Sequence, residues 1–422
     1  MTCNNQNNTS NRCGCEFNLK TVGVANVANI NIDGSNRKAL NWTEISVPEI
    51  LTVPALKPDI ESLDQVYANI QLNSTKLIET PFAYERYVLF SFFNSANDLV
   101  GVLPGLVTAL SGTITALLAP ITGALTTAIN AAITAINALP IPLPGDDAAL
   151  AILQGALDSI NILVNGINDA LTDVTNSVAS LLAAIAAVPF LPDVICAAIQ
   201  ALTSALNALV TLVNTVPALI TTILNALSAA VGSVSPAIAL LINAIIAILE
   251  TGPLSPTAIA ALVSAVVDAV TGILDELLSV DCDEAYAFEI KENAEGTCLS
   301  GRKLVIEGVL KQKVVYTAEV TTQSVHSANY EVPFSAFIIP YASFEGLTYQ
   351  EGIEVYDPTN PTVPKVINGF ISGTTEEIIP NLCEEFNIDT YIEDIFIYAM
   401  DPRTIFKNVT VFLRARVATA CN

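Results

Sequence analysis

The sequence predicts an α+β fold: a β-rich, sandwich-like domain in two sequence-separated pieces, with a large inserted multi-helix bundle. Two observations predict this class. In the middle of the 422-residue chain, apolar residues recur at alternating steps of three and four, which is the spacing of packed helices. On both sides of this region, apolar and polar residues alternate with a period of two, which is typical of half-buried strands.

Charge marks the boundaries of the pieces. No Lys or Arg occurs between Arg86 and Lys291, so all 17 basic residues lie in the flanks. We therefore divide the chain into residues 1–39, 40–97, 98–280 and 281–422. The net charge of −24 argues against a nucleic-acid partner, because this chain has little with which to neutralise phosphates.

The first segment, residues 1–39, is expected to be a flexible arm rich in Asn and Cys, with a lead-in strand. It begins MTCNNQNNTSNRCGCEFNLK and contains no apolar h-region, which is not typical of a secretory signal peptide. We therefore expect synthesis in a cytoplasm.

The first part of the β-rich domain, residues 40–97, contains the stretch WTEISVPEILTVPALKPDIESL at 42–63. Pro48, Pro54 and Pro58 are spaced so that a helix cannot form across them. Proline is tolerated on sheet edges, so we expect an extended segment that lies along an edge.

The helical insert, residues 98–280, contains no charged residue between Leu99 and Gly145, or between Val194 and Leu249. Charge alone would permit membrane spans, but Thr, Ser and Asn recur throughout, and no Lys or Arg flanks any piece. Prolines are also expected to cut the region into pieces of about 15 to 30 residues. These are Pro120, Pro140, Pro189, Pro217, Pro236, Pro253 and Pro256. A membrane is therefore not the favoured environment.

Heptad spacing predicts a bundle of about seven or eight helices. Ser235-Pro236 and Ser255-Pro256 resemble an N-cap followed by proline in the first turn. Shorter rows run from Leu202 to Val213 and from Ile259 to Leu277. The longest row is the candidate self-association seam: Leu157, Ile160, Val164, Ile167, Leu171, Val174, Val178, Leu181 and Ile185.

The outer faces of these helices carry Ala, Thr, Ser and Asn in place of charged residues, and such a surface is inexpensive to desolvate. Three interpretations stay open. We favour a bundle that is partly covered by other copies of the chain. An ordinary monomeric helical domain and a lipid-contacting region are the alternatives.

The second part of the β-rich domain, residues 281–422, contains GRKLVIEGVLKQKVVYTAEV at 301–320, which predicts two strands around Gly308. The stretch NVTVFLRARVAT at 408–419 alternates with a period of two and predicts a half-buried strand.

The sequence offers no catalytic constellation, and we expect no enzyme, cofactor or metal site. His326 is the single histidine and has no nucleophile motif beside it, so a structural hydrogen bond is favoured. Asp281, Asp283 and Glu284 could hold Ca²⁺, but their spacing matches no EF-hand loop. A solvated acidic linker is the favoured interpretation.

Three stretches resemble the domain of SipL-type spore morphogenesis and spore-surface proteins of endospore-forming Firmicutes. They are WTEISVPEILTVPALKPDIESL, GRKLVIEGVLKQKVVYTAE and QSVHSANYEVPFSAFIIP, of which SVHSANYEVPFSAF is the most specific. The helical insert splits the resemblance into two pieces. The resemblance implies a non-enzymatic, β-rich building block of the spore envelope.

Cysteines near the chain ends are candidate cross-links to a neighbouring subunit, with free thiols as the alternative. Cys13-Gly-Cys15 lacks the two-residue spacing of common zinc motifs. The candidate cross-links are Cys3, Cys13, Cys15 and Cys421.

The sequence and the resemblance together predict a self-assembling structural protein of the endospore surface: a coat, exosporium or spore-appendage subunit. We expect synthesis in the mother-cell cytoplasm and, as partners, copies of the chain and other spore-surface proteins. The alternative is a membrane-active or lipid-binding protein that uses the uncharged insert.

Overall fold

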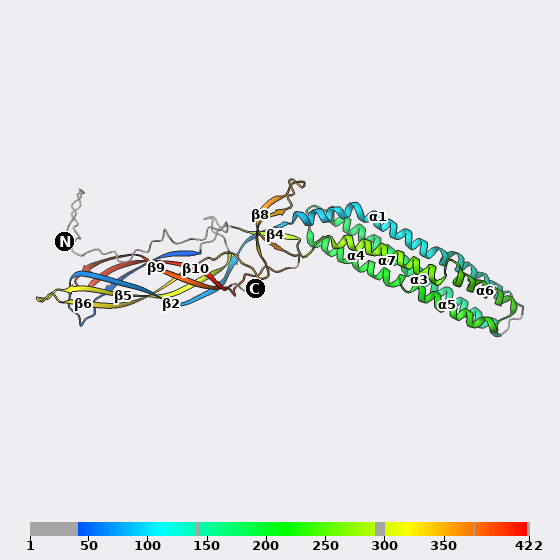
Figure 1. Cartoon of the computed structure of the whole chain (residues 1–422), viewed down its shortest axis with the longest axis horizontal. Coiled ribbons are helices and arrows are strands. Elements are labelled where there is room, and N and C mark those ends of the chain that lie inside the picture. Colours follow the sequence, from blue (N-terminus) through cyan, green and yellow to red (C-terminus); the bar gives the residue numbers. More distant parts are fainter. Residues whose placement is uncertain (1–40, 141–143, 292–299, 375, 420–422) are drawn as a thin grey trace.

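The β-rich part and the helical part lie end to end in an elongated molecule (Figure 1). The structure is a computed structural model, and it describes residues 41–140, 144–291, 300–374 and 376–419. Long strands form one end, a small sheet lies in the middle, and helices form the other end (Figure 1). The predicted α+β class is confirmed.

Two three-stranded antiparallel sheets form the sandwich. One sheet has the order β1-β10-β9, with bounds Trp42–Thr52, Thr404–Thr419 and Glu385–Asp401. The other has the order β2-β5-β6, with bounds Ile60–Phe82, Ser300–Ala318 and Val325–Ile338. Apolar side chains from both sheets share one core. Each sheet therefore combines strands from before and after the helical insert.

A third sheet has the order β3-β4-β8-β7 and is called the collar here. Its strands are Tyr84–Val88, Tyr286–Ile290, Lys365–Ser372 and Tyr349–Val355. β3 leads into the first helix and β4 follows the last, and the two strands pair antiparallel. The chain therefore leaves the collar and returns to it on neighbouring strands.

Seven α-helices lie in the described part of the insert, and several join into longer rods. They are α1 (Phe90–Pro120), α2 (Thr126–Asn137), α3 (Pro144–Ile185), α4 (Pro192–Val213), α5 (Val216–Ala230), α6 (Pro236–Thr251) and α7 (Pro256–Leu278). Helical structure is continuous from Phe90 to Asn137, and from Pro192 to Ser233 it is interrupted only by a turn at Asn214 and Thr215. The 42 residues of α3 correspond to about 63 Å at 1.5 Å per residue. The rods run alongside one another (Figure 1).

Heptad-spaced side chains fill the core of this bundle. The shorter rows predicted from Leu202 to Val213 and from Ile259 to Leu277 are buried, which confirms their inward orientation. In the candidate seam on α3, Ile160, Ile167, Val174, Val178, Leu181 and Ile185 are buried. Leu157, Val164 and Leu171 are half-buried against the same core. These side chains pack inside the chain, and contact between subunits stays a prediction.

The prediction that prolines cut the insert into pieces of about 15 to 30 residues holds where prolines lie at helix breaks, as at Pro140, Pro189 and Pro253, but α3 is longer, with 42 residues, and Pro120 makes no break. Pro104 and Pro120 both lie inside α1, and a π-helical turn, Ile121–Leu125, carries the chain from α1 into α2. A π-turn absorbs the backbone mismatch that proline introduces, so the apolar face continues along the rod. Pro217 likewise lies in the first turn of α5, where proline needs no hydrogen-bond partner.

The helical region begins at Phe90, whereas the sequence placed the start of the insert at residue 98. The aromatic residues of this segment favour strands, but Phe92, Ala96 and Leu99 form a buried helical stripe. Ser235 and Ser255 do occupy N-cap positions, with proline in the following turn. Neither hydroxyl makes the expected capping hydrogen bond.

The prediction of two strands around Gly308 is also wrong, because β5 runs unbroken through this glycine. A Cβ at position 308 would lie 2.5 Å from Phe334 Cζ and 2.9 Å from the carbonyl oxygen of Gln71. Glycine is therefore required for the close packing of the Phe334 ring, and it does not mark a turn. The predicted edge segment at 42–63 is confirmed, since β1 and β2 each lie on a sheet edge.

We expect Ile167→Asp to destabilise the bundle by roughly 3–5 kcal/mol, because an isolated carboxylate would enter an apolar core. Ile162→Asp on the same helix is the control, since Ile162 is 74% exposed and should cost at most about 1 kcal/mol. Thermal unfolding followed by circular dichroism measures both. Equal melting temperatures for the two variants would show that the assigned inward face is incorrect.

Candidate functional site

The junction between the collar and the helices, called the neck here, concentrates most of the specific side-chain contacts in the middle of the molecule. The backbone N–H of Leu89, just before α1, donates to Ala285 O at 3.0 Å. The N–H of Tyr356, just after β7, donates to Val88 O at 2.8 Å. Three segments far apart in sequence therefore meet where the bundle begins.

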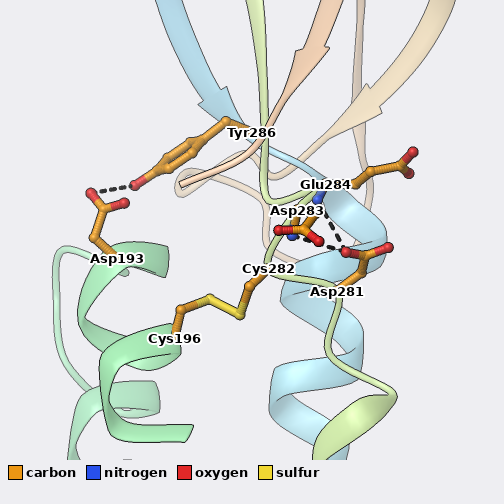
Figure 2. Close-up of a disulfide and its surroundings, with 7 residues drawn as sticks. All are labelled: Asp193, Cys196, Asp281, Cys282, Asp283, Glu284 and Tyr286. Atoms are coloured by element: carbon orange, nitrogen blue, oxygen red, sulfur yellow. Dashed lines mark hydrogen bonds between the residues drawn. A yellow bond between two sulfur atoms is a disulfide. The ribbon is translucent and has the colours of Figure 1, made fainter. Parts of the chain in front are cut away.

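A disulfide joins Cys196 to Cys282 at the neck (Figure 2). Cys196 lies in α4, and Cys282 lies between α7 and β4. The bond closes a loop between residues 86 positions apart. A loop of that length restricts the unfolded chain enough to stabilise the fold by about 4–5 kcal/mol. The bond thus fixes α4 to the segment that returns to the collar.

A second link runs through Tyr286 of β4 (Figure 2). Its hydroxyl donates to Asp193 Oδ2 at 3.1 Å, in the first turn of α4. The Arg86 guanidinium of β3 lies 4.6 Å from the centre of the Tyr286 ring. Burial, helped by the Asp193 carboxylate, raises the pKa of Tyr286 to about 12. The phenol therefore stays protonated and keeps donating at neutral pH.

An aromatic cluster supports the neck on the side of α1. The Phe93 ring stacks on Tyr356 with a centroid separation of 4.1 Å, and Phe190 meets Phe93 edge-on at 5.1 Å. Phe190 comes from the connection between α3 and α4. Aromatic pairs of this kind contribute about 0.5–1.5 kcal/mol each beyond the area they bury.

The collar is buried on both faces. Ala287, Val355 and Ile367 belong to the core of the helical bundle. On the other face, Phe288, Phe344 and Phe370 form a separate aromatic core. Because one small sheet contributes to both cores, bending at the neck would disrupt packing on each side.

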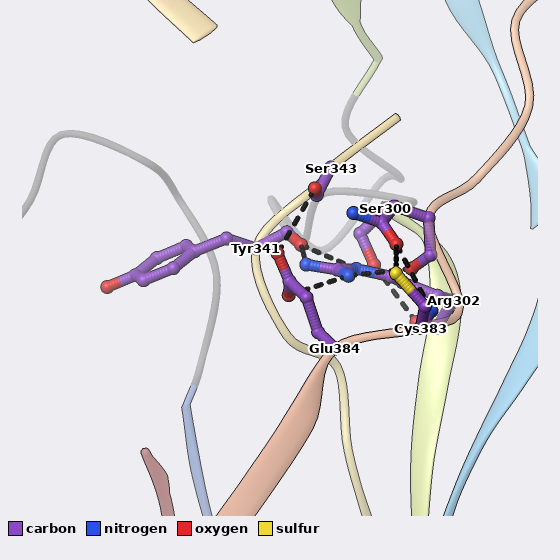
Figure 3. Close-up of polar contacts among 7 residues, drawn as sticks. Ser300, Arg302, Tyr341, Ser343, Cys383 and Glu384 are labelled. Atoms are coloured by element: carbon purple, nitrogen blue, oxygen red, sulfur yellow. Dashed lines mark hydrogen bonds and ion pairs between the residues drawn. The ribbon is translucent and has the colours of Figure 1, made fainter. Parts of the chain in front are cut away.

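An ion pair secures the sandwich side of the neck (Figure 3). Arg302 in β5 is buried, and its Nη1 lies 2.8 Å from Glu384 Oε2. The same guanidinium donates to Tyr341 O from Nε and Nη2, at 3.0 and 2.7 Å, and to Asn381 O from Nη1 at 2.8 Å. Several donors of one planar group thus hold two loop segments against the start of β5.

The acidic stretch after α7 forms a turn. Asp281 Oδ1 accepts the backbone N–H groups of Asp283 and Glu284, at 2.9 and 3.2 Å (Figure 2). Within the described ranges, no group of three or more His, Cys, Asp or Glu is placed to hold a metal ion. His326 Nε2 lies 3.0 Å from Ser324 Oγ, and its ring stacks on Tyr316, so the expected structural hydrogen bond is present.

The structure describes only some of the site residues that the sequence predicted. Cys3, Cys13, Cys15 and Cys421 lie outside the described residues. The α3 seam lies within the bundle core. Sequence reasoning missed the Cys196–Cys282 bond and the buried Arg302. Arg302 lies in an ordinary strand pattern, which gives no signal of its burial or of its ion pair.

Residues 276–346 match the family model described as SipL, SPOCS domain. This segment is similar to the SipL-type SPOCS domain. This family is spore-associated and non-enzymatic, and the matched segment spans the end of α7 and strands β4, β5 and β6. The match does not reach residues 42–63, so the pairing of the two β pieces rests on the strand registers. The search of curated proteins found no match. The search of solved structures also found none.

We expect loss of the Cys196–Cys282 bond to lower the stability of the neck without unfolding the sandwich. In a Cys196→Ala, Cys282→Ala double variant, the loop entropy of about 4–5 kcal/mol is no longer removed from the unfolded chain. Scanning calorimetry should then resolve a separate, earlier transition of the helices. Unchanged melting in this variant would mean that the disulfide does not contribute to coupling the two parts.

Proposed function

We propose that this protein is a self-assembling structural subunit of the endospore surface, in the coat, the exosporium or a spore appendage. The spore association comes from the SPOCS family match. The observation that carries the assembly proposal is the character of the bundle surface, which lacks basic residues and presents many small polar side chains.

The exposed hydroxyls of the bundle are bonded to the helices that carry them. Thr134 donates to Asn130 O, Thr211 to Asn207 O and Thr222 to Ala218 O, each at 2.8 Å. Similar bonds to the carbonyl four residues earlier recur on α1 and α3 to α7. A hydroxyl with a partner inside its own helix loses less when water is removed from it. When these hydroxyls lose water at a contact with another bundle, they would therefore still have a hydrogen-bond partner.

Shape and charge support the same proposal. The bundle projects from the collar as a long rod, so much of its surface is available along its length (Figure 1). Two stretches of its sequence, Leu99–Gly145 and Val194–Leu249, contain no charged residue. A contact between subunits there would not bring like charges together and would not remove water from a charged group. The neck contacts hold the rod to the sandwich, and such a subunit is suited to a regular lattice or fibre.

A membrane-active protein is the second candidate, and one observation favours it. Four helices of the described residues are long and apolar enough to cross a membrane by length and composition. The bundle buries the heptad faces of those helices inside the chain, so insertion would require the bundle to open. The lack of Lys or Arg beside the helices weakens this candidate further.

We expect the purified full chain to form regular polymers without detergent, as seen by negative-stain electron microscopy. Thr211→Lys with Thr222→Lys should reduce polymer formation at least tenfold, because each ammonium must be desolvated at a contact. Asn329→Lys, on the exposed edge strand β6, adds the same charge outside the bundle and should leave assembly intact.

Liposome flotation separates the two candidates in the same samples. Polymers that form without lipid, with no flotation, support the structural role. Flotation with anionic or neutral vesicles, together with detergent-dependent solubility, would support membrane activity instead. A monodisperse monomer that neither polymerises nor floats would contradict both.

We further propose that Cys3, Cys13 and Cys15 form disulfides between subunits after assembly. Tethered thiols held side by side reach effective concentrations in the millimolar range, about where oxidation becomes favourable for ordinary thiols. Non-reducing gels of assembled wild-type protein should show ladders that collapse on reduction. A Cys3→Ser, Cys13→Ser, Cys15→Ser variant should still polymerise but dissolve readily in denaturant. A wild-type monomer band without reductant would rule this role out.

A further inference from the structure

The core of the sandwich contains a lysine side chain. Lys407 of β10 is fully buried, and it lies on the inward face between Ile405 and Val409. Its Nζ has no hydrogen-bond partner among the described residues. Burial lowers the pKa of Lys407 to about 8, against the opposing effect of Glu49. At pH 8 about half of this amine is therefore in its neutral, nucleophilic form.

The facing sheet contributes a second polar side chain to the same interior. Gln312 of β5 is 3% exposed and lies between the inward-facing Leu310 and Val314. Neither its amide nitrogen nor its amide oxygen has a hydrogen-bond partner within the described residues. A buried carboxamide without partners costs stability, so its presence in an otherwise apolar core calls for an explanation.

The two side chains enter the same core from facing sheets, because their strand neighbours Val409 and Leu310 belong to one core cluster. Gln312 is paired with Tyr330, whose hydroxyl donates across the sandwich to Thr52 O at 3.3 Å. Thr52 ends β1, the strand in which Glu49 pairs directly with Lys407. Packed sheets lie about 10 Å apart, a gap that facing lysine and glutamine side chains together can span. The amine and the carboxamide therefore extend into this core from opposite sheets.

Glu49 supplies a proton-transfer group beside the amine. It lies on the same face of β1 as Val47 and Leu51, which are both in the sandwich core. Its carboxylate is close enough to Lys407 to favour the ammonium form. The interior therefore combines a nucleophile, a carbonyl carbon and a carboxylate, shielded from water.

We propose that Lys407 and Gln312 form an intramolecular amide cross-link between the two sheets. The Nζ lone pair attacks Gln312 Cδ, and the bond from Cδ to the amide nitrogen breaks. Glu49 takes a proton from Nζ and gives it to the departing nitrogen, which leaves as ammonia. The net reaction converts an amine and a primary carboxamide into a secondary amide and ammonia, with no oxidant or added reagent.

Intact-mass spectrometry of the full chain, reduced and alkylated, tests this inference. After incubation of the folded protein at pH 8, the wild type should be lighter than its sequence mass by one ammonia. Digestion should yield a branched peptide that joins the Lys407 and Gln312 segments. Lys407→Met and Gln312→Leu should keep their full sequence masses, and both replacements preserve an apolar core so that folding is maintained.

Glu49→Gln should form the link at least tenfold more slowly, because it removes the proton-transfer group. Loss of ammonia elsewhere, such as cyclisation at an asparagine, would persist in the Lys407→Met variant and give no branched peptide. That result, or a wild-type chain at its full sequence mass after incubation, would overturn the inference. The outcome is independent of whether the protein assembles.

Discussion

The antiparallel pairing of β3 with β4 is the constraint on which the rest of the molecule depends. It brings Val88 opposite Tyr286, so the two ends of the helical insert start from neighbouring strands. The longer ladders of β1 with β10 and of β2 with β5 join the same two β pieces within the sandwich. The neck disulfide and the Asp193–Tyr286 hydrogen bond act on a geometry that the strand pair has already set.

The collar also explains how such different surfaces coexist in one chain. Its helix-facing residues join the bundle core, and its opposite face carries Phe288, Phe344 and Phe370. The sandwich core is a separate cluster, linked to this region by the Arg302–Glu384 ion pair. The helical bundle has acidic but no basic residues, while ion pairs such as Arg414–Asp389 lie on the sandwich. Apolar packing stabilises the bundle, and apolar packing together with ion pairs stabilises the sandwich.

Patterns with a period were predictable from the sequence, and contacts between distant residues were not. The heptad rows ending at Val213 and Leu277 and the alternation from Asn408 to Ala415 each report burial along one element. Gly308 and Pro120 were misinterpreted, because their roles depend on the Phe334 ring and on a π-turn. Cys196 and Arg302 act through partners on other elements, and no local pattern records such a partner. Sequence therefore predicts faces of elements better than the pairs formed between them.

The hydroxyl bonds on the helix surface have a consequence for drying. An ordinary charged surface relies on water to solvate its ammonium and carboxylate groups, and dehydration leaves those groups without partners. Thr134, Thr211 and Thr222 keep their partners because the partner is a carbonyl of their own helix. Withdrawal of water from this surface would cost few hydrogen bonds, and rehydration would meet a surface whose polar groups had stayed in place. For these hydroxyls, drying would remove water without removing their hydrogen-bond partners.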